Sequence, residues 1–244
     1  MARVRAPAGG ADAAARRGCA GLSRGVATPA PRPLAIFGGT FDPVHLGHLR
    51  AAWEAAEQLD AEVRLLPARV PPHRPQPLAS AAARVALLRA ALAGQDRLGL
   101  DLRELARPGP SYSVDTLSAL RAEYGTQRPL ILLLGEDACA GLPSWDRWMQ
   151  LFDLAHIVVL TRPASRPPWP DSLQRQWRQR AVAAPAALRA AAAGAMFSLR
   201  VSALEISASQ VRALLAAGRE PRYLLPDALL ADAALLAPYR MPPL

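Results

Sequence analysis

The sequence contains no lysine, so all 29 of its basic residues are arginines. This absence excludes every mechanism that needs a lysine amine, such as a Schiff base with a carbonyl substrate. It equally excludes the lysine of a P-loop and the K-M-S-K-S loop of an aminoacyl-tRNA synthetase. Together with the abundance of alanine and proline, it indicates a GC-rich genome more than a special chemistry.

Cysteines and long apolar runs are also scarce. The two cysteines, Cys19 and Cys139, lie far apart in the sequence and do not make a disulfide framework, which favours a reduced, cytoplasmic setting. No stretch of about eighteen apolar residues is free of charge, so no transmembrane helix is expected. The hydrophobic content of 51% is nevertheless ample for a core in a chain of 244 residues.

The net charge of +9 is unevenly distributed. Residues 1–33 hold six arginines against one acid, Asp12, and their Ala, Gly and Pro content can bury little surface, which predicts a flexible extension rather than a transit peptide. The remainder, with 23 arginines against 19 acids, is only mildly basic. Proteins that bind nucleic acid usually carry a dense basic face, so this balance favours a polyanionic small molecule as the ligand.

From Leu34 onward, short apolar runs alternate with helical patterns. Strands that are buried on both faces and separated by helices imply one parallel sheet with right-handed crossovers. We therefore predict a single α/β domain over 34–244, a Rossmann-like doubly wound parallel sheet with flanking helices and a C-terminal helical segment. The expected strands are 34–37, 62–67, 98–102, 130–134, 156–160 and 197–201, and the expected helices are 45–59, 80–93, 113–124, 148–154, 172–182 and 186–193.

The most informative stretch is F-G-G-T-F-D-P-V-H-L-G-H, residues 37–48, at the end of the first expected strand. A strand, a Gly-Gly turn and a helix leave backbone N–H groups free to hold phosphate. His45 and His48 fall on one face of the helix, and Gly47 between them blocks no ligand. Other interpretations stay open: the histidines could bind a metal or have no role, and Asp42-Pro43 could be only a helix N-cap and first residue.

H-x-G-H after a G-G-T-F-D-P turn resembles the signature of the nucleotidyltransferase superfamily, which joins a nucleoside triphosphate to a phosphate or carboxylate and releases pyrophosphate. Four later segments, in the same order, narrow the resemblance to the bacterial nicotinate-nucleotide adenylyltransferases. They are V-P-P-H-R-P (70–75), S-Y-S (111–113), G-E-D (135–137) and I-S-A-S-Q-V-R (206–212). The resemblance implies an enzyme that transfers the adenylyl group of ATP to nicotinate mononucleotide, forming nicotinate adenine dinucleotide and pyrophosphate in NAD biosynthesis.

The resemblance, together with the Gly-Gly turn, implies a catalytic role for the two histidines. His45 and His48 can donate hydrogen bonds to the α- and β-phosphate oxygens of ATP as charge builds on the leaving pyrophosphate. A helix N-terminus lowers the proton affinity of an imidazole and a bound triphosphate raises it, so the sequence leaves their protonation open. Ser207 and Gln210 form a capping-box pattern at a helix start, which is also suited to phosphate. The remaining ATP contacts that we expect are Gly38, Gly39, Thr40, Phe41, Gly47, Ile206, Ser207, Ser209 and Arg212.

The resemblance also implies a site for the pyridine nucleotide. Arg74 stands where the family usually has lysine, and it preserves the charge with a different geometry. Trp145 matches the aromatic side chain that the family stacks on the pyridine ring, with a buried core tryptophan as the alternative. Arg162 matches an arginine near the carboxylate-bearing nucleotide. The further substrate-binding residues implied are Tyr112, Ser113, Gly135 and Asp137.

Magnesium is expected as a cofactor with ATP, and no dedicated carboxylate cage is present, so phosphates and waters should supply most of its ligands. We expect no nucleic-acid or membrane partner, and the oligomeric state is left open. Within the same class, the alternative is a relative that adenylylates phosphopantetheine or nicotinamide mononucleotide. In a different class, the alternatives are a non-catalytic nucleotide sensor and a nucleic-acid binder that uses the arginine-rich residues 1–33.

Overall fold

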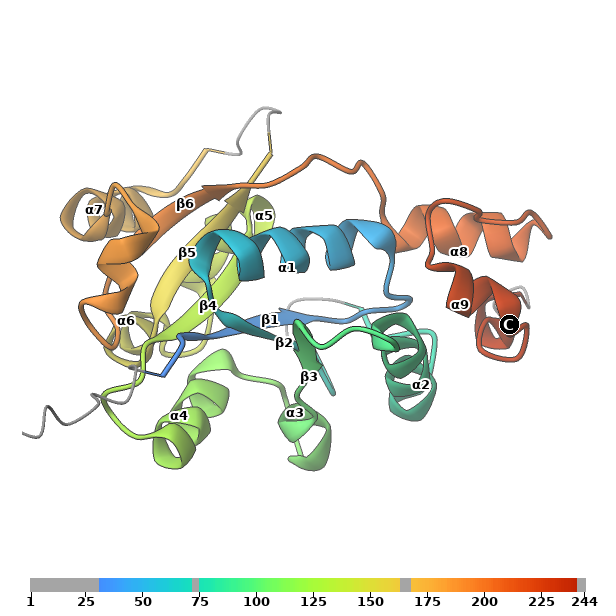
Figure 1. Ribbon diagram of the computed structural model, residues 1–244, viewed down its shortest axis with the longest axis horizontal. Coiled ribbons are helices and arrows are strands. Elements are labelled where there is room, and N and C mark those ends of the chain that lie inside the picture. Colours follow the sequence, from blue (N-terminus) through green and yellow to red (C-terminus); the bar gives the residue numbers. More distant parts are fainter. Residues whose placement is uncertain (1–30, 72–74, 163–167, 241–244) are drawn as a thin grey trace, which may run out of the picture. The chain divides into compact units, whose positions relative to one another are not determined.

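A computed structural model describes residues 31–71, 75–162 and 168–240. Its centre is a sheet of six parallel strands in the order β3-β2-β1-β4-β5-β6 (Figure 1). The predicted parallel α/β fold is therefore confirmed, and each predicted strand lies within two residues of an observed one. The strands are β1 (Leu34–Gly39), β2 (Glu62–Pro67), β3 (Leu98–Leu100), β4 (Leu130–Gly135), β5 (His156–Thr161) and β6 (Met196–Arg200).

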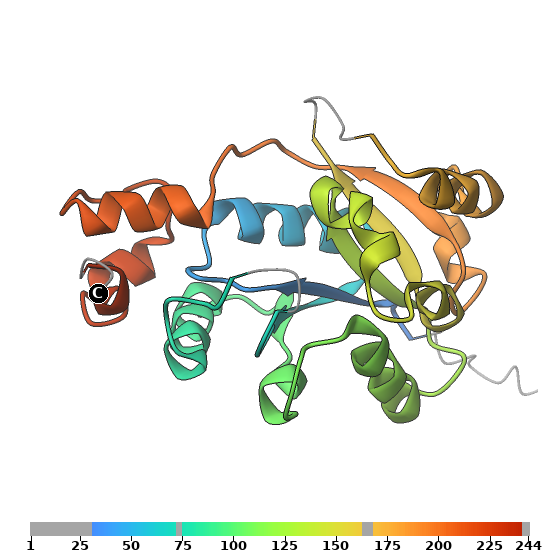
Figure 2. The same ribbon diagram turned by 180° about the vertical axis from the view of Figure 1, so that it is seen from behind.

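Successive side chains of a strand point to opposite faces of the sheet, and both faces are covered here. Alternate strand residues therefore belong to two separate hydrophobic clusters. Ala35 belongs to the cluster beneath α1 (Leu46–Leu59), α2 (Ala81–Leu92) and α8 (Ala208–Ala216). Ile36 belongs to the opposite cluster, with α4 (Ser113–Tyr124), α5 (Glu136–Ala140), α6 (Leu151–Leu154) and α7 (Asp171–Arg180). Figure 1 shows α1 in front of the sheet, and Figure 2, seen from behind, shows α5 in front.

Several short helices were not predicted. They are α3 (Arg103–Ala106), α5 and the 3₁₀ turn η1 (Leu142–Ser144). Two predicted helices are less regular than expected, because 148–154 begins with the 3₁₀ turn η2 (Trp148–Gln150) and 186–193 is the 3₁₀ turn η3 (Pro185–Arg189). The predicted C-terminal helical segment, for which the sequence indicated no bounds, is present as α8, α9 (Asp227–Ala231) and α10 (Ala237–Arg240). No helix of the described residues is long and apolar enough to cross a membrane.

The first described residues are already joined to the sheet. Pro33 accepts a hydrogen bond from the Glu62 amide at 2.9 Å, and the Arg32 carbonyl accepts one from the Arg128 guanidinium at 2.9 Å. The rest of the predicted extension, residues 1–30, lies outside the described residues.

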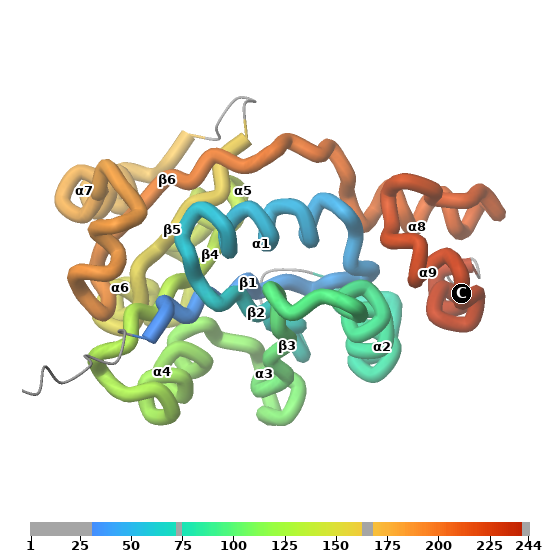
Figure 3. The backbone as a smooth tube through the Cα atoms, in the orientation of Figure 1, coloured from blue at the N-terminus to red at the C-terminus, as the bar shows by residue number. Residues whose placement is uncertain are grey.

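The strand order reverses between β1 and β4, since β2 and β3 lie on one side of β1 and β5 and β6 lie beyond β4. In such sheets, ligands bind outside the carboxyl ends of the strands at this switch point. From β6 the chain runs in an extended segment (201–207) past the N-terminus of α1 and into α8 (Figure 3). The fold thus brings two segments that are far apart in sequence to the switch point.

Candidate active site at the switch point of the sheet

The turn that follows β1 is shaped by the aromatic ring of Phe41. Phe41 has φ +50°, in the left-handed region, and its ring is 1% exposed. A Cβ on Gly39 would lie 2.9 Å from the Phe41 ring, so only glycine fits there. A Cβ on Gly38 would meet nothing within 4 Å, which leaves its backbone open to a ligand. Phe41 could therefore contact ATP only through its backbone, because its ring belongs to the core.

Helix α1 begins at Leu46, with His45 as its N-cap. The interpretation of Asp42-Pro43 as the N-cap and first residue of the helix is therefore wrong. Asp42 is 5% exposed, and its carboxylate accepts hydrogen bonds from the backbone N–H groups of Leu78 at 2.7 Å and Ala79 at 3.0 Å. The amide of Leu46 donates to the carbonyl of Leu224 at 2.9 Å, so this amide of the helix start is not available for phosphate.

His45 and His48 form a stacked pair. Their ring centroids are 3.7 Å apart with an interplanar angle of 27°, and the His48 Nδ1 accepts a hydrogen bond from the His45 amide at 3.4 Å. The edge of the Phe41 ring packs against His48, with the centroids 5.1 Å apart. Across the described ranges, no three histidine, cysteine or carboxylate side chains gather as a metal site. The pair is thus held as a unit by its own stacking and by the turn beneath it.

Burial decides the protonation of His45, which the sequence left open. The ring is 4% exposed, and burial, assisted by the positive charge of Arg162, lowers the pKa of His45 to about 4. His45 is therefore neutral at pH 7 in the absence of ligand. Its Nδ1 is buried without a hydrogen-bond partner and would lie 3.1 Å from a Cβ on Gly47. The His45 ring lies against the space that a side chain at position 47 would need, so glycine there accommodates the histidine.

The start of α8 meets the start of α1. Ser207 is the N-cap of α8 and accepts a hydrogen bond from the Gln210 amide at 3.1 Å, as the capping pattern predicts. Arg212 donates to the Asp42 carbonyl at 2.7 Å and to the Ser209 hydroxyl at 3.1 Å. Ile206 lies 3.6 Å from the position of a Cβ on Gly47. The predicted ATP contacts in 206–212 and in 38–48 therefore share one side of the molecule.

Three of the predicted substrate contacts lie at the carboxyl ends of β4 and β5. Gly135 ends β4 and caps α5, and Asp137 is exposed in the first turn of that helix. Arg162 follows β5, its side chain is exposed, and its amide donates to the Glu136 carboxylate at 3.3 Å. The positive charge of Arg162, at the carboxyl end of β5, contributes after burial to the lowered pKa of His45.

The other predicted substrate contacts come from loops on the α4 side of the sheet. Tyr112 caps α4 and Ser113 is its first residue, while Trp145 is half-buried against the same hydrophobic cluster as Tyr112. The amide of Ser111 donates to the Val70 carbonyl at 3.0 Å, which links 111–113 to the loop that leads to Arg74. Arg74 itself lies outside the described residues.

The sequence analysis did not predict three buried charged residues that form hydrogen bonds near the candidate site. Arg84 is 1% exposed and donates to the Thr40 carbonyl at 2.7 Å. Glu54, 7% exposed on α1, accepts hydrogen bonds from the amide of Ser202 at 2.7 Å and from its hydroxyl at 2.6 Å. Glu104, 5% exposed on α3, accepts one from the Thr116 hydroxyl at 2.7 Å. A charged residue within an apolar helical stretch, such as Arg84 in A-A-A-R-V-A-L-L, is the sequence pattern that could have indicated these buried charges.

Comparison with known proteins shows which family the chain resembles. Residues 36–214 match the family model described as cytidylyltransferase-like. A probable nicotinate-nucleotide adenylyltransferase from Pseudomonas syringae is 46% identical over 216 residues, covering 88% of this chain and 97% of its own length. One from Pseudomonas aeruginosa is 50% identical over 199 residues, covering 81% and 92%. The chain belongs to the nicotinate-nucleotide adenylyltransferase family. The family predicted from the five sequence segments is confirmed.

Solved structures share the fold at low sequence identity. The nicotinic acid mononucleotide adenylyltransferase of Plasmodium falciparum, solved in complex with APC, superposes with a TM-score of 0.59 at 14% identity. The match covers 82% of this chain and 95% of that one. The same enzyme in complex with NaAD gives a TM-score of 0.60. A likeness at this identity establishes the fold alone.

Proposed function

We propose that this protein transfers the adenylyl group of ATP to nicotinate mononucleotide, with release of pyrophosphate. The observation that carries the proposal is the meeting of the stacked His45–His48 pair, in which His45 is neutral, with the start of α8 at the switch point of the sheet. Family membership supports the choice of substrates. We also propose that the enzyme acts in the cytoplasm on small molecules, without a nucleic-acid or membrane partner.

The reaction needs no covalent intermediate. A phosphate oxygen of the mononucleotide attacks the α-phosphorus of ATP, a new P–O bond forms in line with the bond that breaks, and the β- and γ-phosphates leave as pyrophosphate. The site must align the two phosphates and stabilise the charge that grows on the leaving oxygen. Neutral His45 suits this task in the tautomer whose proton is on Nε2. Nε2 can then donate to a phosphate oxygen, and the buried Nδ1 carries no proton that would need an acceptor. His48 donates beside it from the first turn of α1.

The remaining ATP contacts fit the same arrangement. Ser207 and Ser209 are exposed at the start of α8, where the backbone amides and the helix dipole favour the β- and γ-phosphates. Arg212 adds a positive charge one turn further on. Gly38 offers backbone without a side chain in the way. Mg²⁺ would enter as part of the Mg–ATP substrate, with phosphates and waters as most of its ligands.

For the second substrate we propose Arg162 as the residue that selects the acid form. Its exposed guanidinium, at the carboxyl end of β5, can pair with the carboxylate of the pyridine ring, while Trp145 stacks on the ring. Tyr112 and Ser113 at the start of α4, together with Gly135 and Asp137, would contact the rest of the nucleotide. An amide in place of the carboxylate would lose the charge-assisted bond to arginine.

The test is to follow pyrophosphate release by the purified protein with Mg–ATP and either mononucleotide. We expect turnover with nicotinate mononucleotide and kcat/KM for the amide to be lower by roughly tenfold or more, the value of a charged hydrogen bond. Arg162→Gln should reduce the difference in kcat/KM between nicotinate mononucleotide and the amide. No pyrophosphate with either mononucleotide would refute adenylyl transfer, whereas preference for the amide would refute only the assignment of the acid substrate.

A further inference from the structure

The catalytic turn is held by a residue from the end of the chain. Tyr239 lies on α10, its side chain is 1% exposed, and its hydroxyl donates to Asp42 Oδ1 at 2.8 Å. Because Asp42 Oδ1 also accepts from the Ala79 amide and Oδ2 from the Leu78 amide, the buried carboxylate has three donors. Burial first, and the hydrogen bond to Asp42 second, raise the pKa of Tyr239, so its hydroxyl remains protonated and remains a donor.

This turn needs support from outside itself. Phe41 adopts φ +50°, a conformation that a residue with a side chain keeps only when its surroundings enforce it. The carbonyls on both sides of Phe41 are bound by arginines: Arg84 of α2 donates to that of Thr40, and Arg212 of α8 to that of Asp42. Tyr239 of α10 holds the Asp42 side chain as the third contact.

Asp42 lies three residues before His45, and the ring of Phe41 packs against His48. A shift of Asp42 would therefore be transmitted to both histidines. Of the three contacts, those from Arg84 and Arg212 reach backbone carbonyls, and only Tyr239 ties the Asp42 side chain to the C-terminal helix. The position of α10 is thereby coupled to the position of the histidine pair.

We propose that Tyr239 is a positioning residue for adenylyl transfer: its hydroxyl, through Asp42, fixes the turn that presents His45 and His48 to the triphosphate. The proposal rests on the function proposed above. It assigns the C-terminal helix a part in catalysis although Tyr239 touches no substrate.

The test is Tyr239→Phe, which keeps the packed ring and removes only the hydroxyl. We expect kcat to fall roughly tenfold, since displacement of a catalytic group by about 1 Å can cost up to a hundredfold. KM for nicotinate mononucleotide should change little, and the thermal midpoint should fall by no more than a few degrees. A tyrosine that served only to stabilise the fold would lower the thermal midpoint and leave kcat intact.

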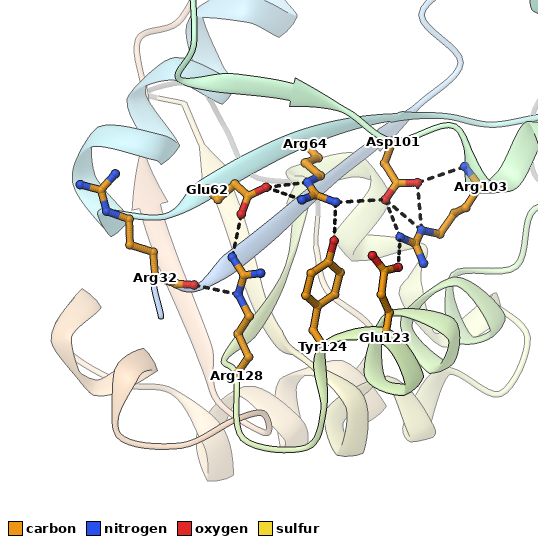
Figure 4. A network of polar contacts seen from close by, with 8 residues as sticks. All are labelled: Arg32, Glu62, Arg64, Asp101, Arg103, Glu123, Tyr124 and Arg128. Carbon is orange, nitrogen blue, oxygen red and sulfur yellow. Dashed lines mark hydrogen bonds and ion pairs between the residues drawn. The ribbon is translucent and has the colours of Figure 1, made fainter. Parts of the chain in front are cut away.

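The matched control is Tyr124→Phe. The Tyr124 hydroxyl is also bound to a charged partner, accepting from the Arg64 guanidinium at 2.8 Å, but it lies in the polar network of Figure 4 near the start of β2, away from the histidines. We expect this variant to keep the wild-type kcat. An unchanged kcat in Tyr239→Phe, or an equal loss in both variants, would overturn the proposal.

A second variant, Asp42→Asn, decides the question if Tyr239→Phe does not fold. It preserves the shape of the side chain but puts an NH2 group in place of one carboxylate oxygen, so at least one of the three donors loses its acceptor, and we expect a similar fall in kcat with a folded protein. A folded Asp42→Asn with wild-type kcat would overturn the proposal. Wild-type protein without turnover would refute the proposed function and this inference together, whereas active wild type with unaffected variants would refute the inference alone.

Discussion

At the scale of single residues, the two histidines of the candidate site differ in how deeply they are buried. His45 is almost completely buried and its pKa is lowered to about 4, whereas His48 is half-buried between the stacked ring of His45 and the edge of Phe41. A neutral buried imidazole donates a hydrogen bond without bringing an extra charge into the site. His48 is the more exposed of the two imidazoles on this face of α1.

We predict that His48→Ala lowers kcat roughly a hundredfold or more, because removal of one preorganised donor to a developing oxyanion has this effect. The measurement is the steady-state rate of pyrophosphate release at saturating ATP and nicotinate mononucleotide. The thermal midpoint, measured on the same sample, controls for unfolding. A variant with a wild-type rate would show that His48 has no catalytic role.

The identity of these residues could be predicted from the sequence, but their partners could not. Short local sequence patterns contain His45, His48 and Arg212, and these patterns indicate phosphate binding without a structure. The hydroxyl of Tyr239 reaches Asp42 across 197 positions of sequence, and Arg84 reaches Thr40 across 44. Such contacts depend on how the helices pack on the sheet, so no local pattern could have indicated them.

At the scale of secondary-structure elements, helix α1 contacts both segments of the proposed triphosphate site. Its N-terminus carries the histidine pair, and two turns later Glu54 binds the amide and the hydroxyl of Ser202. Ser202 begins the segment that leads to the cap of α8 at Ser207. The hydrogen bonds from Ser202, together with the neighbouring Arg50, lower the pKa of Glu54 despite its burial, so it binds this segment as a carboxylate at neutral pH.

We predict that Glu54→Gln raises KM for ATP roughly threefold to tenfold, because it replaces a charge-assisted hydrogen bond by a neutral one. The loosened segment 202–207 would hold the start of α8 less firmly. Glu57→Gln is the matched control, since Glu57 is exposed on the same helix. An equal effect of both substitutions, or of neither, would contradict the anchoring role of Glu54.

The elements themselves were predictable to different degrees. The strands are short apolar runs buried on both faces, and their sequence pattern therefore fixed their bounds within two residues. Helices α3 and α5, with four and five residues, are too short to show a helical period. They also lack side-chain caps, since Leu102 and Gly135 make no capping hydrogen bond, so no start signal marks them.

At the scale of the whole molecule, buried histidines make stability depend on pH. His156 begins β5 with no exposed surface; its Nε2 bonds the Ala191 carbonyl at 2.9 Å and its Nδ1 accepts from the Ala195 amide at 3.0 Å. Burial lowers the pKa of His156, as it does that of His45. The unfolded chain therefore binds more protons than the folded one below pH 6.5, and stability falls as the pH decreases from there.

We predict that the free energy of unfolding decreases between pH 7 and pH 5, by at most about 1.4 kcal/mol per pH unit for each such histidine. The raised pKa of Glu104 acts in the opposite direction near the lower end of this range. Urea unfolding of wild type and His156→Gln at both pH values measures the effect, because glutamine can keep both hydrogen bonds without titrating. The variant should show the shallower decrease, and an equal pH dependence would exclude His156 as a cause.

The central claim is that the start of α1 and the start of α8 bind one triphosphate together. The most direct measurement is hydrogen–deuterium exchange of residues 38–48 and 202–212 with and without a non-hydrolysable Mg–ATP analogue. The account predicts that exchange slows in both segments over the same range of analogue concentration. Protection of one segment alone, or of neither at a concentration that saturates binding, would contradict it.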